Sequence, residues 1–190
     1  MTGNCKNFVR DIEFLLEVWY NSRVGIKEES MKILLTIIYI TVIGQVCFFF
    51  GLSLPREKFN ENLFPYKTYT WENGGKIYNI VHVKKWKSHV PDMSTLPNKL
   101  MPKKINRHIT SADVDKLVKE SCVAELIHYL LCVFSIGIYN IWENGIGVWL
   151  AILYILLGNV PYIIIQRYNR PNFVSLRDRL KIREERNAHG

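Results

Sequence analysis

Residues 111–140 read SADVDKLVKESCVAELIHYLLCVFSIGIYN, a stretch that changes character halfway along. In its first three turns, apolar residues recur at helical spacing among acidic and basic ones, which predicts an amphipathic helix. From residue 123 to residue 141 the chain is almost wholly apolar, and about 20 such residues suffice to cross a bilayer. Thr110 or Ser111 can cap the start of this helix, with Asp113 at its positive end. The stretch therefore predicts a helix that enters a membrane from a polar flank.

Two ionisable residues, Glu125 and His128, interrupt this apolar run. Because they are three positions apart, they share one face of a helix. An ionisable group within a membrane helix costs about 2.5–3.5 kcal/mol by insertion scales, so it generally faces protein or water and has a function. Glu125 and His128 are therefore the first candidates for a functional site.

Two further apolar blocks, residues 33–54 and 146–166, have a similar length, and none of the three blocks contains Lys or Arg. A soluble domain rarely contains even one such run. The expected fold is all-α: an integral membrane helical bundle of about three transmembrane helices, forming a single membrane domain over residues 1–190. The expected spans are residues 33–54, 121–141 and 146–166, with Pro55 ending the first and Pro161 kinking the third.

Three segments lie outside the expected spans. In the head, residues 1–30, apolar side chains from Phe8 to Trp19 form one helical face, followed by a polar connection to the first span. This pattern fits an amino-terminal interfacial helix on the membrane, or alternatively a helix packed against the spans. Residues 55–120 are polar but rich in aromatic side chains, which is typical of a mostly irregular segment at the headgroup level. The tail, residues 167–190, is basic and expected to be helical.

The formal net charge of +8 is unevenly distributed. Residues 55–120 include thirteen basic and seven acidic side chains, the tail seven and three, and the first 32 residues five of each. Because basic residues near span ends mark the cytoplasmic side, the middle segment and the tail should be cytoplasmic and the amino terminus outside. The basic run around Lys85 and Trp86 favours anionic lipid headgroups over nucleic acid, with a simple solvated charged surface as the alternative.

A short turn at residues 142–145 makes the last two spans an antiparallel pair. The third span then brings residues 161–170 to the depth at which the second span holds Glu125 and His128. Two polar sets that are distant in sequence should therefore meet at the same leaflet, on the cytoplasmic side.

Several motifs follow one another in a recognisable order. They are FPYK (64–67), WE (71–72), GKIY (75–78), VKKWK (83–87), AELIH (124–128), NVP (159–161) and QRYNRP (166–171). In that order they resemble the glycosyl-diaponeurosporenoate acyltransferase family. These are small bacterial membrane proteins named for the last step of staphyloxanthin-type carotenoid synthesis, the esterification of a glucose hydroxyl with a fatty acyl chain. The resemblance extends from about Phe64 to Pro171. Val123 and Tyr129 depart from it, since Arg and Trp are common at these places.

The resemblance implies an acyltransferase in the bacterial cell membrane, and the distribution of basic residues predicts that its site faces the cytoplasmic leaflet. Acyl transfer to a hydroxyl needs a base, donors for the developing oxyanion and space for the chain. His128 is the expected base, and Glu125 would fix its tautomer or share the proton. Arg167, Asn169 and Arg170 would hold a phosphate of the acyl donor or the oxyanion, and an apolar cleft between the spans would hold the tail. The other expected substrate-binding residues are Tyr168, Asn159, Gln166, Trp71, Glu72, Lys85 and Trp86.

The implied partners are a lipid or glycolipid acceptor, a fatty acyl donor and the membrane. No nucleic acid, metal or other cofactor is expected, and the oligomeric state is left open. The four cysteines, at positions 5, 47, 122 and 132, form no CxxC motif or Cys/His cluster, so they are interpreted as small thiols. No Gly-x-Ser-x-Gly elbow offers a nucleophile for an acyl-enzyme, which favours direct transfer.

Other interpretations stay open. In a purely structural interpretation, Glu125 pairs with Arg167 or Arg170 of the third span and holds the bundle together. His128 then hydrogen bonds to a backbone carbonyl freed by the proline at position 161. A rival catalytic pair, His108 and Asp113, has the His-x-x-x-x-Asp spacing of glycerolipid acyltransferases. Two alternative functions are also open: a non-enzymatic lipid-binding or assembly protein, and a transferase of another group, such as methyl.

Overall fold

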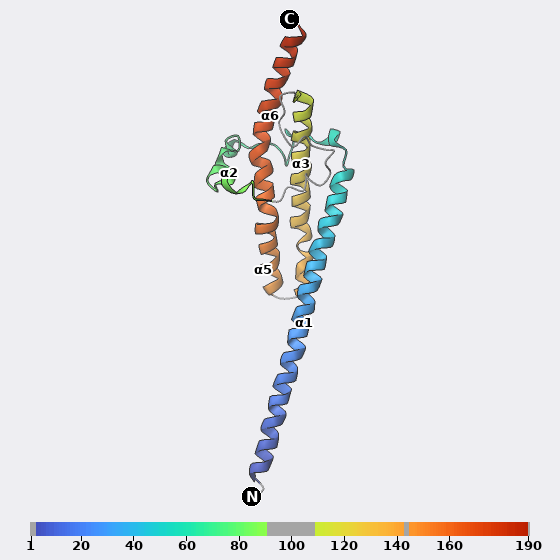
Figure 1. Ribbon diagram of the computed structural model, residues 1–190, viewed down its shortest axis with the longest axis vertical. Coiled ribbons are helices and arrows are strands. Elements are labelled where there is room, and N and C mark those ends of the chain that lie inside the picture. Colours follow the sequence, from blue (N-terminus) through green and yellow to red (C-terminus); the bar gives the residue numbers. More distant parts are fainter. Residues whose placement is uncertain (1–2, 91–108, 143–144, 190) are drawn as a thin grey trace.

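The computed structural model describes residues 3–90, 109–142 and 145–189, and it is built from helices (Figure 1). Within these ranges there is no strand, so the all-α fold predicted from the sequence is confirmed. The α-helices are α1 (Gly3–Ser53), α2 (Val83–Trp86), α3 (Ser111–Phe134), α4 (Gly137–Trp142), α5 (Gly145–Leu153) and α6 (Val160–Ala188). The 3-10 helices are η1 (Arg56–Lys58), η2 (Thr70–Glu72) and η3 (Lys76–Asn79), and η5 (Tyr154–Asn159) is a π-helix.

Three helical stretches are long and apolar enough to cross a membrane: Gly25–Ser53, Ser111–Trp142 and Gly145–Ala188. They overlap the three spans predicted from the sequence. Large apolar side chains on them point outward; Ile37 on α1 and Leu157 on the third span are 57% and 68% exposed. Contiguous apolar surface of this kind is unfavourable in water and fits contact with lipid tails.

α1 is one uninterrupted helix of 51 residues, about 77 Å long at 1.5 Å per residue. Its amino-terminal half projects beyond the bundle (Figure 1). The sequence suggested a head joined to the first span by a polar connection, but residues 21–30 are helical, so head and span are continuous. Lys and Glu are good helix formers, and Lys32 donates to Glu28 one turn away at 2.7 Å. α1 ends at Ser53, just before Pro55, as predicted.

α3 and α6 pack as a long antiparallel pair (Figure 1). The predicted cap is present: the Thr110 hydroxyl accepts the Asp113 N–H at 3.2 Å, and the Asp113 carboxylate accepts the Thr110 N–H in return. At the same end, Ser111 donates its N–H and its hydroxyl to Glu184, near the end of α6. These contacts fix a register that places the middle of α6 beside the middle of α3.

The carboxy-terminal half of α1 lies against α3 and α4 (Figure 1). At one end, Arg56, just after α1, donates to Glu120 of α3 at 2.7 Å. At the other, the Tyr39 hydroxyl donates to the Phe134 carbonyl at 2.6 Å, beside Gly137. Gly137 has no room for a side chain, because a Cβ there would collide with the Tyr39 hydroxyl. The three spans therefore form one bundle.

The third span is not a regular α-helix. Between α5 and α6 the backbone forms the π-helix η5, and Pro161 stands in the first turn of α6. Proline has no N–H and clashes with the carbonyl four residues earlier, so a wider turn before it lets the helix continue. The sequence predicted a kink at Pro161, and the irregularity that the structure shows there is a π-helical turn. The Asn159 side-chain Nδ2 donates to the Tyr154 carbonyl across it at 3.2 Å.

Residues 55–90 form short 3-10 helices, the short α-helix α2 and turns; η3 and α2 pack against α6, and η1 packs against α3. Residues 73–75, Asn-Gly-Gly, form a turn in which all three residues have positive φ. Gly75 is also required for space, since a Cβ there would stand 3.1 Å from the Tyr168 carbonyl oxygen of α6. This close approach brings η2, and with it Glu72, against the third span.

Candidate active site

Arg167 on α6 lies at the centre of a group of buried charges. Its Nε and Nη2 donate to the two carboxylate oxygens of Glu72 at 2.6 and 2.8 Å. Its Nη1 donates to Glu125 Oε1 on α3 at 2.7 Å, and the carbonyls of Pro65 and Lys67 accept the other two N–H groups. All five N–H groups of this guanidinium are therefore in use.

Arg170, one turn further along α6, is only 2% exposed and holds the other side of Glu125. Its Nη2 donates to Glu125 Oε2 at 2.5 Å and to the Ser121 carbonyl at 2.9 Å. Its Nε donates to the Ser121 hydroxyl and its Nη1 to the Tyr66 carbonyl, both at 2.8 Å. The Tyr129 hydroxyl adds a hydrogen bond to Glu125 Oε1 at 2.7 Å. The meeting of the second and third spans that the sequence predicted is thereby confirmed.

Two carboxylates and two guanidiniums form this charge cluster, which consists of Glu72, Glu125, Arg167 and Arg170. Desolvating an ion costs several kcal/mol, a cost that close pairing and additional hydrogen bonds offset. Burial alone would raise the pKa of the Glu72 carboxyl, but hydrogen bonds from Arg167, Tyr78 and the Tyr69 backbone bring it below its ordinary value. Burial and the bond to Glu72 raise the pKa of Tyr78 to about 12. At neutral pH Glu72 is therefore a carboxylate and Tyr78 a neutral donor.

His128, one turn beyond Glu125, belongs to a separate hydrogen-bonded pair. Its Nδ1 lies 3.0 Å from Asn159 Oδ1, and its ring stacks on Tyr162 with ring centroids 4.5 Å apart. Because the Asn159 amide nitrogen donates to the Tyr154 carbonyl, the amide oxygen faces the imidazole and accepts a hydrogen bond from Nδ1. In the neutral imidazole the proton is thereby placed on Nδ1, and Nε2 carries the lone pair of a base.

The two residues first singled out in the sequence therefore have different surroundings. Among the hydrogen bonds of the described residues, none joins Glu125 to His128. Asn159, rather than Glu125, contacts the imidazole, and it does so through a side-chain amide instead of a freed backbone carbonyl. The pairing of Glu125 with arginines of the third span, held open as an alternative, occurs with both Arg167 and Arg170.

A third group lies at the edge of the charge cluster. Lys87 Nζ donates to Asn169 Oδ1 at 3.0 Å and stands 4.8 Å from the centroid of the Tyr168 ring. Burial, together with the neighbouring Lys84, lowers the pKa of Lys87. The other predicted residues lie further out: Gln166 is half-buried, Lys85 is exposed, Trp71 stacks on Tyr69, and Trp86 donates to the Val81 carbonyl. In the described part of the chain, no three His, Cys, Asp or Glu side chains gather as metal ligands would.

Sequence reasoning missed several residues that satisfy the buried charges. Ser121 and Tyr129 lie four positions before and after Glu125, so helical spacing placed both on its face and was a usable signal. The contacts of Tyr66 and Tyr78 depend on how residues 55–90 fold, and no periodic pattern in the sequence predicts them. His108 lies outside the described residues, so its proposed pairing with Asp113 stays a prediction.

The family profile described as glycosyl-4,4'-diaponeurosporenoate acyltransferase matches residues 62–179. The matched region contains the whole charge cluster together with His128 and Asn159. The chain belongs to this acyltransferase family. It is therefore an acyltransferase, as the sequence resemblance implied.

Curated relatives support this family assignment. The glycosyl-4,4'-diaponeurosporenoate acyltransferase of Staphylococcus aureus strain bovine RF122 / ET3-1 is 32% identical over 137 residues, which cover 72% of this chain and 82% of that protein. The proteins of the same name from strains N315 and USA300 are 31% identical with the same coverage. No solved structure matches the chain.

Proposed function

We propose that this acyltransferase moves a fatty acyl chain to a hydroxyl of a lipid-like acceptor such as a glycosylated carotenoid, with His128 as the general base. The S. aureus relatives are named for acyl transfer to glycosyl-4,4'-diaponeurosporenoate. The observation that carries the proposal is the pair formed by His128 and Asn159 within the family-matched region, because it defines which ring nitrogen accepts a proton.

In the proposed reaction, the acceptor hydroxyl attacks the acyl carbonyl carbon while its proton passes to Nε2 of His128. The imidazolium keeps its Nδ1–H on the Asn159 oxygen, which stabilises the positive charge. The bond between the acyl carbon and the leaving group of the donor then breaks, and the leaving group takes the proton from Nε2. The ester remains on the acceptor, the imidazole is neutral again, and no acyl-enzyme forms.

The charge cluster has a positioning role in this proposal. Arg167 uses all five of its N–H groups and Arg170 four of five within the protein, so neither is a ready oxyanion donor. Glu125 acts through the register of α3 and α6, which decides where His128 stands. At the edge of the cluster, Lys87 with Asn169 offers an ammonium and an amide to a phosphate of the acyl donor.

The proposed location is the bacterial cell membrane, with the charge cluster and His128 near the cytoplasmic leaflet. The basic residues of the middle segment and the tail support this orientation. A polar donor headgroup would then approach from the cytoplasm, while the lipid acceptor arrives within the leaflet.

Replacing His128 with alanine tests the proposed base. Loss of a general base typically lowers a rate by about 10²–10⁴-fold, so acylated lipid should fall by that factor while the protein still folds. The measurement is mass spectrometry of lipid and pigment extracts from cells that express each variant. The matched control is His89→Ala, which removes an exposed histidine and should leave the product level unchanged.

A wild-type product level in His128→Ala would contradict the proposed base and would favour a non-enzymatic lipid-binding role for this site. Asn159→Asp and Asn159→Ala add a second readout. If Asn159 fixes the tautomer, the aspartate variant should retain more activity than the alanine variant and should shift the pH–rate profile. Equal losses without any such shift would assign Asn159 a merely structural role.

A further inference from the structure

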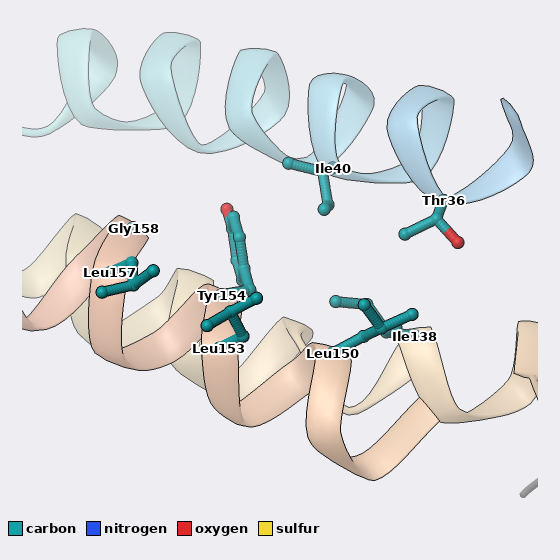
Figure 2. A pocket seen from close by; sticks show the side chains of 8 residues that line it. All are labelled: Thr36, Ile40, Ile138, Leu150, Leu153, Tyr154, Leu157 and Gly158. Atoms are coloured by element: carbon teal, nitrogen blue, oxygen red, sulfur yellow. The ribbon is translucent and has the colours of Figure 1, made fainter. Parts of the chain in front are cut away.

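An apolar pocket of about 400 Å³ lies between α1 and the third span (Figure 2). Its volume falls within the roughly 300–1,000 Å³ usual for ligand pockets. Apolar side chains from α1, α4, α5 and η5 dominate its walls, including those of Ile40, Ile138, Leu150, Leu153 and Leu157. The pocket opens within the apolar part of the bundle, so its occupant must be a hydrocarbon group.

One end of the pocket adjoins the candidate active site. Gly158 lines the pocket, and the next residue, Asn159, hydrogen bonds to His128. The opposite end is marked by Thr36 and Leu150, where the Trp142 indole donates to the Thr36 hydroxyl at 2.9 Å and ties α1 to α4. A chain in the pocket would therefore have one end near the base and the other near this tie.

The shape of the pocket favours a flexible chain over a rigid one. Leu150 and Gly158 are eight positions apart, a rise of about 12 Å at roughly 1.5 Å per residue, which is less than half of a hydrocarbon core about 30 Å thick. Figure 2 shows Tyr154 rising from η5 toward α1 between the two ends. A saturated chain can bend around this ring, whereas a conjugated polyene cannot.

We propose that this pocket binds the fatty acyl chain of the donor and that the end at Thr36 and Leu150 limits the chain length that is transferred. This inference rests on the proposed acyl transfer, and it assigns the pocket to the donor rather than to the carotenoid part of the acceptor. The acyl carbonyl then lies at the Gly158 end, beside Asn159 and His128.

Filling the end of the pocket at Thr36 and Leu150 tests the proposal. Leu150→Trp should shorten the preferred acyl chain, whereas Leu156→Trp should not, because Leu156 lies on the same span but is 54% exposed and does not line the pocket. Each variant is reconstituted in vesicles made from the lipid extract of cells that lack the protein. The vesicles then receive an equimolar mixture of lauroyl, palmitoyl and stearoyl thioesters as acyl donors. Mass spectrometry of the ester product should show the lauroyl share several-fold higher for Leu150→Trp alone. An unchanged distribution, or the same shift in both variants, would overturn the proposal.

Two further measurements keep the test decisive. If Leu150→Trp does not fold, Leu150→Ala enlarges the same end and should raise the stearoyl share. Separately, a photoreactive palmitic acid is crosslinked to the full-length His128→Ala protein, which needs no turnover. Labelling of the pocket-lining residues of α1, α4 or the third span, with no transfer by the wild type, would retain the pocket and reject the proposed function. Transfer by the wild type with labelling elsewhere would reject the pocket and retain the function.

Discussion

A single carboxylate, Glu125, contacts both buried arginines of the charge cluster, so its charge matters more to the fold than that of any exposed acid. Glu125→Gln keeps the shape of the side chain but leaves Arg170 without a carboxylate and Arg167 with Glu72 alone. Breaking a buried ion pair from one side costs about 3–5 kcal/mol, so the free energy of unfolding in detergent should fall by that amount. Denaturant titration followed by circular dichroism measures it.

The matched control is Glu120→Gln, which disrupts a pair between Glu120 and Arg56 whose side chains are 23% and 21% exposed. Solvent reaches this pair, so its loss should cost about 1 kcal/mol or less. Equal effects of the two substitutions would contradict the view that the charge cluster, rather than surface pairing, holds the spans together.

Glu72 gives the fold a dependence on pH. Its pKa is below the ordinary value of 4.5 in the folded protein, so its charge stabilises the fold above about pH 4.5. This contribution is lost as the pH falls through the lowered pKa. In thermal unfolding from about pH 7 to about pH 3, the wild-type midpoint should fall more steeply than that of Glu72→Gln, which starts lower and lacks this titration. Parallel curves would mean that Glu72 is not ionised in the fold.

At the scale of elements, the packing of α1 on α4 depends on one missing side chain. In Gly137→Ala the new methyl group would collide with the Tyr39 hydroxyl, so the free energy of unfolding should fall by about 1–3 kcal/mol. Gly44→Ala is the control, because a Cβ at Gly44 meets nothing within 4 Å. Alanine in a helix is favoured over glycine, so that variant should gain roughly 0.5–1 kcal/mol. An equal loss of unfolding free energy in Gly44→Ala would contradict the view that the contact between Gly137 and Tyr39 is what the substitution disturbs.

The elements also show how far the sequence could predict the site. Hydropathy predicted the three spans, and the short turn between the last two placed Glu125 at the depth of Arg167 and Arg170, because an antiparallel pair has a fixed register. The second carboxylate of the cluster comes from η2, and its position depends on the backbone of residues 73–75 and on the close fit of Gly75 against α6. Neither property has a periodic signal in the sequence.

The contact between His128 and Asn159 could not be predicted from the sequence for another reason. Asn159 ends the π-helix η5, whose i→i+5 turns change the direction in which its side chain points, and no pattern in the sequence predicted this element. The continuous α1 escaped prediction because charged residues with high helix propensity resemble a polar connection in a hydropathy pattern.

At the scale of the whole molecule, the termini lie at opposite ends of the bundle (Figure 1), which agrees with an odd number of spans. The distribution of basic residues predicts that the amino terminus is outside and the middle segment cytoplasmic. In a variant that keeps only Cys5 among its cysteines, a membrane-impermeant maleimide should label intact cells. Moving the single cysteine to the exposed position Ser88 should make labelling depend on permeabilisation. The reverse pattern would turn Lys87 and Asn169 away from the cytoplasm, and a donor with a charged headgroup would then have to reach them from outside the cell.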